Sequence, residues 1–600
     1  MTMPTFAHSL HRRHVDISGE PLAAGLERRR WEVRGTVQGV GLRPFVHRLA
    51  ADLALSGRVR NVGGIVVIDM DGPAARLEAF EVRLRAEAPP LADVTALVQL
   101  PPVPGHPFAG FVIEQSAAAE SPGHAVHRDV PPDAGICDAC LAELFDPADR
   151  RYRYPFINCV DCGPRASIIR ALPYDRVSTS MDRFPMCPEC AAQYEDPVDR
   201  RFHAEPVACA ACGPRLSWHA SGASAEPAFG ESALLAAAAA LASGRIVALK
   251  GLGGYQFVCD ATDEDAVLRL RARKLRPTKP FAIMVENLSA AQRYARLCTA
   301  EERLLDGPAR PIVLVGPRTG HGRAPLAPSV RAGSRGIGIC LPATGLHHLL
   351  LREAAKPLIV TSGNLGGEPV VIDETDALTR LTAVADGVCA HDRPILARYD
   401  DSVTIVHDDA PSVVRRARGF SPAPLGLPVP SPEPLLATGA QLDHTFTLAT
   451  GAHAVVGPQL GDLADAAAYE AFLGALDRAG RLHRVESRFV AHDLDPGFLS
   501  TRYAVEHFPE RRRLGVQHHH AHIASCAAEH GLTGDVIGVA YDGPGLGDDG
   551  TFWGGEVMVA NLTGYTRIGR FARASMPGGA EASAHPERTA LAYQIGRAHV

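Results

Sequence analysis

The hydrophobic and polar positions of the chain alternate in ways that predict several α/β units. The alternation at Arg30–Val37 predicts a strand that begins a small α/β unit, which continues to about Gln115. A helical pattern at Glu231–Ser243 precedes the apolar run Ile246–Leu249, which is typical of a buried strand. From there to about Pro424, apolar runs alternate with helical patterns. We therefore expect a multidomain α/β and α+β protein.

Stretches rich in Pro, Ala and Ser predict where these units are joined. Residues 116–132 and 221–230 are expected to be linkers, and the Pro-rich stretch 422–434 is expected to mark a boundary before a last α/β segment, which begins at Leu435. Residues 1–28 are polar and rich in Arg, which predicts a disordered leader rather than a signal peptide. The expected divisions are 1–28, 29–116, 130–220, 228–425 and 433–594, followed by 595–600, which we expect to be a non-native tail.

Composition indicates an ordinary globular protein with more than one core. The chain has 600 residues, of which 46% are hydrophobic and 21% are charged, so about three to five domains are expected. A net charge of −6 gives no general attraction to nucleic acid or to anionic membranes, and no apolar stretch is long enough to cross a bilayer. Five of the thirteen cysteines are scattered, which argues against a disulfide scaffold. We therefore expect a cytoplasmic protein that binds neither membrane nor nucleic acid.

The other eight cysteines form four Cys-x2-Cys pairs with regular spacing. Eighteen residues separate the two pairs within each half, twenty-four separate the halves, and each half ends in Cys-Gly-Pro-Arg. Paired thiolates on tight turns suit tetrahedral zinc, and four thiolates leave no open position for catalysis, so two structural Zn²⁺ sites are predicted. Spacing alone allows sequential pairing or ligation interleaved between the halves. The predicted ligands are Cys137, Cys140, Cys159, Cys162, Cys187, Cys190, Cys209 and Cys212.

A glycine-bearing loop joins the first predicted strand to a helix within Gly35–Val46. Glycines allow backbone N–H groups to approach an anion, and the helix N-terminus adds its dipole, so the loop is a candidate phosphate cradle. Arg43 offers a planar fork for phosphate oxygens. The string resembles the acylphosphatase signature, which implies that Arg43 holds the phosphate and that Asn61 orients the attacking water. The same resemblance implies that phosphate is bound by Gln38, Gly39, Val40, Gly41 and Leu42.

A lysine and a flexible loop, Lys250–Tyr255, follow the buried strand. Ligands bind at the carboxyl ends of strands in α/β enzymes, so this loop is a candidate binding site. Downstream, Lys274, Arg276 and Lys279 place three cations within six residues, and Ser362-Gly363-Asn364 follows another apolar strand. The combination of K-x-R-x2-K with S-x-N resembles the YrdC family, whose members join a carbamoyl-type group to AMP. It implies that Lys274, Arg276 and Lys279 hold phosphates and that Ser362 and Asn364 help to bind the nucleotide or carbamate, and Lys250 is a further candidate ligand from its place at the strand end.

Two further groups of arginines flank these motifs. Arg269–Arg273 by itself is expected to be a solvated helix face, because a run of charges usually faces water. Arg415, Arg416 and Arg418 are predicted as further phosphate contacts.

Four histidines lie within the five residues His518–His522. His518 and His522 are spaced i, i+4 on one helical face, where two imidazoles can share a metal. A glycine-rich loop follows at Asp542–Gly550, and together with Gly461–Leu463 and Ala491–Asp493 these motifs resemble the TsaD-type ASKHA nucleotide-binding domain. The resemblance implies a divalent metal at His518 and His522 that contacts ATP phosphates. It also implies nucleotide binding by Asp542, Gly543, Gly545 and Gly547.

In this order, the four groups of motifs resemble one family, the HypF carbamoyltransferases of [NiFe]-hydrogenase maturation, from about Arg29 to about Ala592. The resemblance implies an acylphosphatase-like ferredoxin-type α/β sandwich, tandem four-cysteine zinc modules, a YrdC-like α/β domain and a partial ASKHA/TsaD-like domain. It also implies that carbamoyl phosphate is hydrolysed to carbamate, which reacts with ATP, supplied with Mg²⁺, to form carbamoyl-adenylate and pyrophosphate. The implied acceptor is the C-terminal cysteine of HypE, whose thiocarboxamide is the precursor of the cyanide ligands.

The last domain departs from the family pattern at three positions. Pro544 stands in place of Thr, Asp495 in place of His and Gln459 in place of His. The family continues beyond the end of this sequence, so the chain is expected to be truncated at its C-terminus.

Two alternative functions use parts of the same sequence. A tRNA threonylcarbamoylation enzyme would also use YrdC-like and TsaD-like domains, but it would need neither an acylphosphatase module nor paired four-cysteine sites. A zinc-scaffold or chaperone-like binding protein would explain the Cys-x2-Cys modules, because such modules also occur in co-chaperones.

Overall fold

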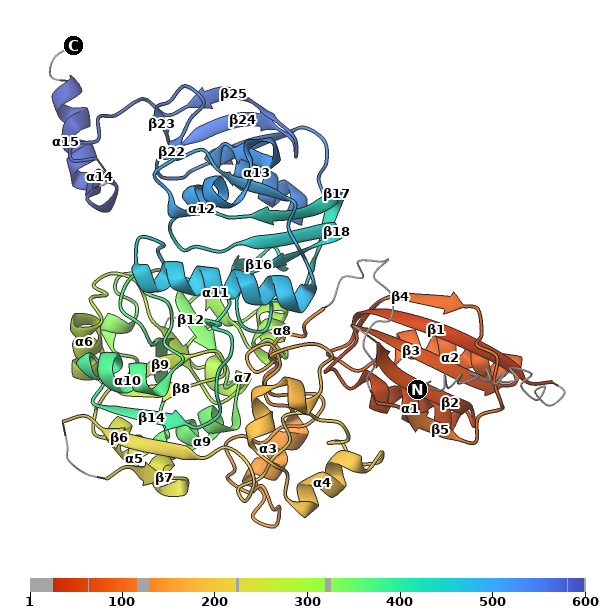
Figure 1. Ribbon diagram of the computed structural model, residues 1–600. Helices are drawn as coiled ribbons and strands as arrows, with labels where there is room; N and C mark the ends of the chain where they lie inside the picture. Colours follow the sequence, from red (N-terminus) through yellow and green to blue (C-terminus); the bar gives the residue numbers. More distant parts are fainter. Residues whose placement is uncertain are drawn as a thin grey trace, which may run out of the picture. The chain divides into compact units, whose positions relative to one another are not determined.

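The structure is a computed structural model that describes residues 25–62, 64–115, 129–222, 226–318, 325–579 and 581–597 (Figure 1). The chain divides into two compact units, Met1–Glu120 and Ser121–Val600, each of which is described by itself. Within the described ranges, no helix has the length and apolar character needed to span a membrane.

The predicted leader ends earlier than expected. Residues 1–24 lie outside the described residues, but the first strand, β1, begins at Glu27. The prediction is therefore wrong for Glu27 and Arg28. These two residues belong to the strand because Arg28 forms an ion pair with the neighbouring strand. Its Nε donates to Oδ1 of Asp71 at 2.6 Å.

The first unit is a five-stranded sheet with two helices packed against it. The strand order is β4-β1-β3-β2-β5, and all neighbouring strands are antiparallel except β2 and β5. Alternate residues of β1, Trp31 and Val33, are fully buried with Leu49 and Phe80 of the helices. The elements are β1 (Glu27–Thr36), α1 (Leu42–Asp52), β2 (Ser56–Val62), β3 (Ile65–Gly72), α2 (Ala74–Ala86), β4 (Asp93–Leu100) and β5 (Phe111–Ile113). This is the predicted ferredoxin-type sandwich.

The zinc region opens the described part of the second unit and consists of two similar modules with little regular structure. In each module the first Cys-x2-Cys pair lies at the start of a short helix, α3 (Asp138–Phe145) or α4 (Pro188–Glu195). Two short 3₁₀ helices, η1 (Arg176–Ser178) and η2 (Ser180–Arg183), lie between them. This confirms the predicted tandem modules.

The next domain is built on a mixed eleven-stranded sheet. Its order is β16-β15-β11-β12-β10-β13-β9-β8-β14-β6-β7. The strands are β6 (Leu216–Ala220), β7 (Ala228–Phe229), β8 (Val247–Lys250), β9 (Tyr255–Asp260), β10 (Ala282–Met284), β11 (Ile312–Val315), β12 (Ile337–Cys340), β13 (Leu358–Ser362), β14 (Gly387–His391), β15 (Val403–His407) and β16 (Ala410–Arg415).

The boundary between the zinc region and this domain differs from the prediction. We expected residues 221–230 to separate the two, but β6 pairs with β14 and β7 pairs with β6, so the sheet contains both sides of the expected linker. Gly387 permits this pairing, because a Cβ there would lie 2.3 Å from the Trp218 ring. Residues 223–225 lie outside the described residues.

Helices cover both faces of the large sheet, and each face has its own core. One core contains residues of α6 (Glu264–Arg273), α7 (Leu288–Ala291), α8 (Thr299–Asp306) and α10 (Glu374–Arg380). The other contains residues of α5 (Glu231–Ala242) and α9 (Gly345–Ala354), together with part of the zinc region. Strand β8 alternates between them, with Ala248 in the first core and Val247 and Leu249 in the second. The short 3₁₀ helices are η3 (Pro328–Val330) and η4 (Leu381–Ala383).

The last part of the unit contains a four-stranded sheet in the order β18-β17-β19-β20 and a three-stranded sheet in the order β21-β24-β25. Helix α13 contacts both sheets (Figure 1). The elements are β17 (Leu425–Ala437), β18 (Thr447–Val456), α11 (Ala466–His483), β19 (Phe489–Asp493), α12 (Leu499–His507), η5 (Glu510–Arg512), β20 (Arg513–Val516), α13 (His518–Glu529), β21 (Val536–Ala540), β22 (Gly545–Leu546), β23 (Phe552–Trp553), β24 (Glu556–Ala560), β25 (Tyr565–Arg570), α14 (Glu581–Ala584) and α15 (Pro586–Arg597). Helix α15 includes the first three residues of the predicted tail, 595–600, and the other three lie outside the described residues.

The Pro-rich stretch contains the predicted boundary, because the large sheet ends with β16 at Arg415 and a strand of the next sheet begins at Leu425. Residues 425–437 form β17, which pairs with β18 at Leu425–Gly426, at Ser431 and at Leu435–Ala437, with register irregularities between them, and with β19 only at Leu435–Ala437. The prolines at 428, 430, 432 and 434 are not among the residues that pair with β18 or β19, so their missing N–H groups remove no hydrogen bond from the sheet. Over these residues only one edge is paired with another strand, which allows a strand to form.

Candidate phosphate, zinc, nucleotide and metal sites

The predicted phosphate cradle is the loop between β1 and α1. Gly39 and Gly41 have φ values of 69° and 76°, a left-handed conformation that favours glycine, and Gly41 is the N-cap of α1. The loop therefore leads into the N-terminus of a helix, whose dipole favours a bound anion. Val40 and Leu42 are almost fully buried in the core, so they contribute packing as well as backbone.

Asn61 carries the clearest sign of a ligand site in this unit. It lies on β2, opposite Val66 of β3, and is fully buried. Among the described residues, neither Oδ1 nor Nδ2 of its amide has a hydrogen-bond partner. Buried amides are almost always paired in folded proteins, so an unpaired one indicates a missing polar ligand or water. Arg43 is also buried, with 7% of its surface exposed, and Gln38 donates from Nε2 to the carbonyl of Ile65 at 3.4 Å.

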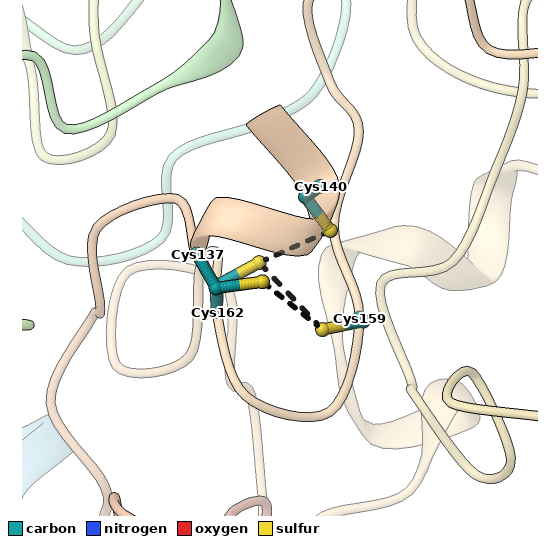
Figure 2. Close-up of side chains that lie close together, drawn as sticks. All are labelled: Cys137, Cys140, Cys159 and Cys162. Carbon is teal, nitrogen blue, oxygen red and sulfur yellow. Dashed lines mark hydrogen bonds between the residues drawn. The ribbon is translucent and has the colours of Figure 1, made fainter. Parts of the chain in front are cut away.

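The eight predicted zinc ligands form two separate four-sulfur clusters, and Figure 2 shows the first of them. A tetrahedral zinc with bonds of about 2.3 Å requires sulfur atoms about 3.8 Å apart. In the first cluster, Sγ of Cys159 lies 3.6 Å from that of Cys137 and 3.9 Å from that of Cys162. In the second, Sγ of Cys209 lies 3.8 Å from those of Cys187 and Cys212. The geometry fits two structural zinc ions.

The pairing of the cysteines is sequential. Each cluster takes its four sulfur atoms from one half of the array, Cys137 to Cys162 or Cys187 to Cys212, and the ligand atoms within a cluster lie within 4.8 Å of one another. Ligation interleaved between the halves, which spacing alone left open, does not occur in this arrangement.

The K-x-R and S-x-N motifs meet at one site through Lys274. Its Nζ donates to the carbonyls of Ser362 and Asn364 at 2.7 and 2.6 Å and to Oδ1 of Asn364 at 3.0 Å. Oγ of Ser362 also donates to Oδ1 of Asn364, at 2.7 Å. Lys274 is the C-cap of α6, whereas Ser362 ends β13, so only the fold brings them together.

Arg271 organises the loop that carries the other two predicted cations. It was expected to belong to a solvated face, but only 7% of its surface is exposed. Its guanidinium donates to the carbonyls of Arg276 and Lys279 at 2.8 and 3.1 Å, and this fixes the loop between them. The solvated-face prediction is therefore wrong at this position, because five backbone carbonyls converge on a single side chain. Arg276 donates to Oγ1 of Thr361 at 3.4 Å, and Lys279 is exposed.

The other predicted cations of this domain are held inside it. Lys250 is buried and donates from Nζ to the carbonyl of His391 at 2.8 Å. Arg415 forms an ion pair with Asp400 at 2.8 Å. Arg418 forms one with Asp401 at 2.9 Å. Arg416 donates to the carbonyl of Phe420 at 3.2 Å.

Lysine is rare in this chain, and its positions are a signal for the site. The sequence has 61 lysines and arginines in total, of which four are lysine. Three of these are the predicted ligands Lys250, Lys274 and Lys279. Burial lowers the pKa of Lys250 to about 8 and that of Lys274 to about 7. A bound anion would favour the protonated form of each lysine, so the charge of these two buried ammonium groups responds to a ligand at the site.

The predicted metal ligands are joined by a third ligand from the glycine-rich loop. Nε2 of His518 and of His522 lie 2.9 and 3.0 Å from Oδ2 of Asp542. The two Nε2 atoms are 3.3 Å apart. Asp542, predicted as a nucleotide ligand, thus lies in the histidine cluster. Two imidazoles and a carboxylate are ordinary ligands of a divalent metal, so the residues fit one.

Asp493 completes this cluster from the opposite side of His518. Its Oδ2 accepts a hydrogen bond from Nδ1 of His518 at 2.6 Å, which leaves Nε2 free to point at Asp542. This hydrogen bond, opposed by burial, raises the pKa of His518. A carboxylate behind a metal-binding histidine fixes the ring and its tautomer. The sequence motif contained Asp493, but the residue was not predicted to act on the histidine.

The glycines of the last loop differ in what surrounds them. A Cβ at Gly545 would lie 2.7 Å from Cβ of His518, and one at Gly547 would lie 2.0 Å from Nε1 of Trp553. These two positions therefore require glycine for close packing of the loop on α13 and β23. The backbone N–H of Gly543 donates to Oδ1 of Asp542 at 2.7 Å.

The three departures from the family pattern lie in loops of the last domain. Gln459 donates from Nε2 to Oδ1 of Asp443 at 2.6 Å. Oδ1 of Asp495 accepts from the backbone of Gly497 at 2.8 Å. Pro544 follows Gly543 in the loop of the histidine cluster.

Family models match the chain in each of its domains. The acylphosphatase model matches residues 29–113 and the HypF finger model matches residues 136–169 and 186–219. The Sua5/YciO/YrdC model, described as telomere recombination, matches residues 239–417. The HypF Kae1-like domain matches residues 430–529, and the second subdomain of the Kae1-like carbamoyltransferase domain matches residues 538–598.

Relatives match over almost the whole chain. Carbamoyltransferase HypF2 of Cupriavidus necator is 46% identical over 95% of this chain and 72% of its own length. Carbamoyltransferase HypF of Synechocystis is 45% identical over 94% of this chain and 72% of its own length. A crystal structure of full-length HypF in its phosphate- and nucleotide-bound form has a TM-score of 0.88 at 40% identity, covering 95% of this chain and 73% of that one.

These matches confirm the predicted fold class, the order of the domains and the enzyme class, a carbamoyltransferase with an acylphosphatase domain. The threonylcarbamoylation alternative accounts for neither the acylphosphatase domain nor the HypF fingers, and the scaffold alternative accounts for the zinc region alone. With relatives more than 40% identical over nearly its whole length, the chain belongs to the HypF carbamoyltransferase family.

Proposed function

We propose that the chain uses carbamoyl phosphate and ATP to transfer a carbamoyl group to a HypE-type acceptor protein, for the cyanide ligands of [NiFe]-hydrogenase. In the first step, water attacks carbamoyl phosphate and yields carbamate and phosphate. Asn61 orients the water and Arg43 holds the phosphate, with the cradle Gln38–Leu42 around it. The buried amide of Asn61 supports this assignment, because neither its Oδ1 nor its Nδ2 has a hydrogen-bond partner among the described residues.

In the second step, a carbamate oxygen attacks the α-phosphorus of ATP, which forms carbamoyl-adenylate and releases pyrophosphate. The observation that carries this proposal is the joining of the two motifs by Lys274, which holds Ser362 and Asn364 in one place. Arg276 and Lys279 lie on the loop fixed by Arg271, where they would meet phosphate oxygens. A HypF structure that holds phosphate and nucleotide supports the same use.

In the third step, the sulfur of the acceptor's C-terminal cysteine attacks the carbamoyl carbon, and AMP leaves. His518, His522 and Asp542 would hold a divalent metal, which supplies charge stabilisation for phosphate groups when bound. Asp493 orients His518, and Gly543, Gly545 and Gly547 allow the loop to lie against α13.

The experiment that tests the proposal measures AMP and pyrophosphate formed by purified full chain with carbamoyl phosphate and ATP. We expect both products only when carbamoyl phosphate is present. Dependence on threonine and bicarbonate instead would contradict the proposal in favour of threonylcarbamoylation. If a chain that holds two zinc ions forms neither AMP nor pyrophosphate, the proposed adenylation step is wrong.

Lys274→Met is expected to reduce carbamoyl-phosphate-dependent ATP–pyrophosphate exchange roughly 100-fold, because a positioned cation in a water-poor site contributes about that much. Hydrolysis of carbamoyl phosphate alone should not change, because the cradle lies in the other unit. Lys356→Met is the matched control, since Lys356 pairs with Asp260 and makes no contact with Ser362 or Asn364. Equal losses in both variants would contradict the assignment.

Asp493→Asn is expected to weaken metal binding at the histidine cluster about 10- to 100-fold, because the carboxylate behind His518 is lost. The measurement is titration of the full chain with Mn²⁺, followed by the disappearance of free Mn²⁺ signal in electron paramagnetic resonance. Asp495→Asn is the control, because that side chain accepts from Gly497 and not from a histidine. Unchanged affinity in Asp493→Asn would show that His518 needs no support from this carboxylate.

A further inference from the structure

The two zinc modules share a second repeat that the cysteines do not explain. The sequence Asp-Pro-x-Asp-Arg-Arg occurs at residues 146–151 and again at 196–201, fifty residues later. Each copy lies inside the eighteen-residue loop that its own zinc ion would close. The local turns are the same, since Oδ1 of Asp149 accepts from the backbone of Arg151, and Oδ1 of Asp199 from that of Arg201, both at 2.7 Å.

The first arginine of each copy contacts the sulfur atoms of the other module. Arg150 donates to Sγ of Cys187 and Cys190 at 3.4 Å and of Cys209 at 3.3 Å. Arg200 makes two equivalent contacts in the opposite direction, to Sγ of Cys140 at 3.1 Å and of Cys137 at 3.9 Å. Each cysteine cluster thus lies against a guanidinium supplied by its neighbour.

The second arginine of each copy crosses to the other module as well. Nε of Arg151 donates to the carbonyl of Ala208 at 2.9 Å, and Nε of Arg201 donates to the carbonyl of Asn158 at 3.2 Å. These two carbonyls are themselves fifty residues apart. Arg151 and Arg201 are almost fully buried, with 1% and 2% of their surfaces exposed.

The side chains that accept hydrogen bonds from these arginines also occupy equivalent positions in the two modules. Arg151 donates to Oε1 of Gln193 at 2.7 Å, and Arg201 donates to Oε2 of Glu143, the residue at the equivalent position. Arg200 also pairs with Glu143, at 2.6 Å. The contact is therefore self-complementary, as at the interface of a symmetric dimer, although both halves belong to one chain.

The charge of a four-thiolate zinc site explains why arginines lie there. Zn²⁺ with four thiolates has a net charge of about −2, and hydrogen bonds from a cation to a thiolate are strengthened by that charge. Groups that donate hydrogen bonds to metal ligands hold the ligand atoms in place. Loss of such a group typically lowers metal affinity about 10- to 100-fold.

We propose that the two zinc sites are one coupled unit, in which each site is stabilised by the arginines of the other module and loses its zinc more readily when the other site is empty. The coupling is a consequence of where the arginines lie. Zinc at the first site closes the loop between Cys140 and Cys159, and that loop carries Arg150 and Arg151. Without zinc at the first site, this loop can adopt many conformations, and in most of them Arg150 and Arg151 no longer contact the second site.

The test measures which cysteines become reactive when zinc is removed from the full chain. Zinc release to a chelator is followed with time, and alkylated cysteines are identified by peptide mass spectrometry. In Arg150→Ala we expect release from the second site to accelerate about 10- to 100-fold, with Cys187 and Cys209 alkylated first. In Arg200→Ala we expect Cys137 and Cys140 to be alkylated first.

Arg153→Ala is the matched control, because Arg153 lies in the same loop as Arg150 but pairs with Glu231 and Glu353. Arg150→Lys keeps the charge without the fork, so its release rate should lie between those of wild type and Arg150→Ala. The proposal is contradicted if Arg150→Ala exposes the cysteines of its own module first, or releases zinc no faster than Arg153→Ala does.

The coupling itself is tested by breaking one site and observing the other. In Cys162→Ser, we expect zinc at the second site to be released to the chelator at least about 10-fold faster than in wild type, because Arg150 and Arg151 are no longer held. Release from the second site at the wild-type rate, with one zinc per chain retained, would overturn the coupling.

Discussion

Asn61→Leu is expected to abolish most carbamoyl phosphate hydrolysis, by a factor on the order of 10²–10³, while making the first unit more stable. The amide of Asn61 is fully buried, and neither of its polar atoms has a partner among the described residues. Replacing an unpaired polar group by an apolar side chain of similar size removes a desolvation cost of about 1–2 kcal/mol. Phosphate release measures the activity, and hydrogen exchange of peptides from β2 and α1 measures the local stability.

The combination of lower activity and higher stability distinguishes a catalytic asparagine from a structural one. A structural residue would lose stability when replaced, and the loss of activity would follow from unfolding. Arg43→Ala should lower hydrolysis to a similar degree, whereas Arg48→Ala, on the exposed side of the same helix, should leave it unchanged. Full hydrolysis in Arg43→Ala would favour a binding protein over a hydrolase.

Cys162→Ser is expected to release zinc from the first site and to loosen the adjacent face of the large sheet. A structural zinc site contributes roughly 10 kcal/mol or more of apparent binding free energy, which is lost with one ligand. Cys140, Cys159 and Cys162 are buried in the same core as Leu346 and Leu349 of α9. The effect should therefore reach the YrdC-like domain, as faster hydrogen exchange in α5 and α9.

The second site provides the comparison for this experiment. Of its four ligands, only Cys212 packs against that core, so Cys190→Ser should disturb α5 and α9 less than Cys162→Ser does. Cys526→Ser, at an exposed cysteine, should change neither zinc content nor exchange. Hydrolysis of carbamoyl phosphate should survive in every case, because the first unit has its own core. Equal exchange in α5 and α9 for both zinc-site variants, while the first site of Cys190→Ser still holds its zinc, would contradict this account.

Most secondary structure could be predicted where local patterns and tertiary contacts agree. The helix predicted at Glu231–Ser243 is α5, Glu231–Ala242, and the buried run after it is β8. The Pro-rich stretch was predicted correctly as a boundary, but strand β17 within it was missed, because prolines disfavour a strand without showing whether their missing N–H groups would be needed for pairing. The leader and the linker at 221–230 were placed wrongly at their ends for a related reason, since strands there are fixed by partners distant in sequence.

Candidate residues could be predicted when they belonged to a motif, and were missed when their role depended on a distant partner. Lys274, Ser362 and Asn364 were found from spacing, but their contact is decided by the fold, which brings the end of α6 to the end of β13. Arg271 was expected to face water, because a run of charges does not show that backbone carbonyls surround one of them. Asp542 was found as part of a phosphate loop and lies instead against His518 and His522.

The sequence by itself determined the order of the domains, the eight cysteines and the motif residues, because these depend on residue type and spacing. Only the tertiary structure decided how the cysteines pair, that Arg150 and Arg200 cross to the other zinc module, and that Asp493 holds His518. The physical reason is the same in each case. Thiolates, guanidiniums and carboxylates act over a few ångströms, and the fold alone sets such distances between residues far apart in the chain.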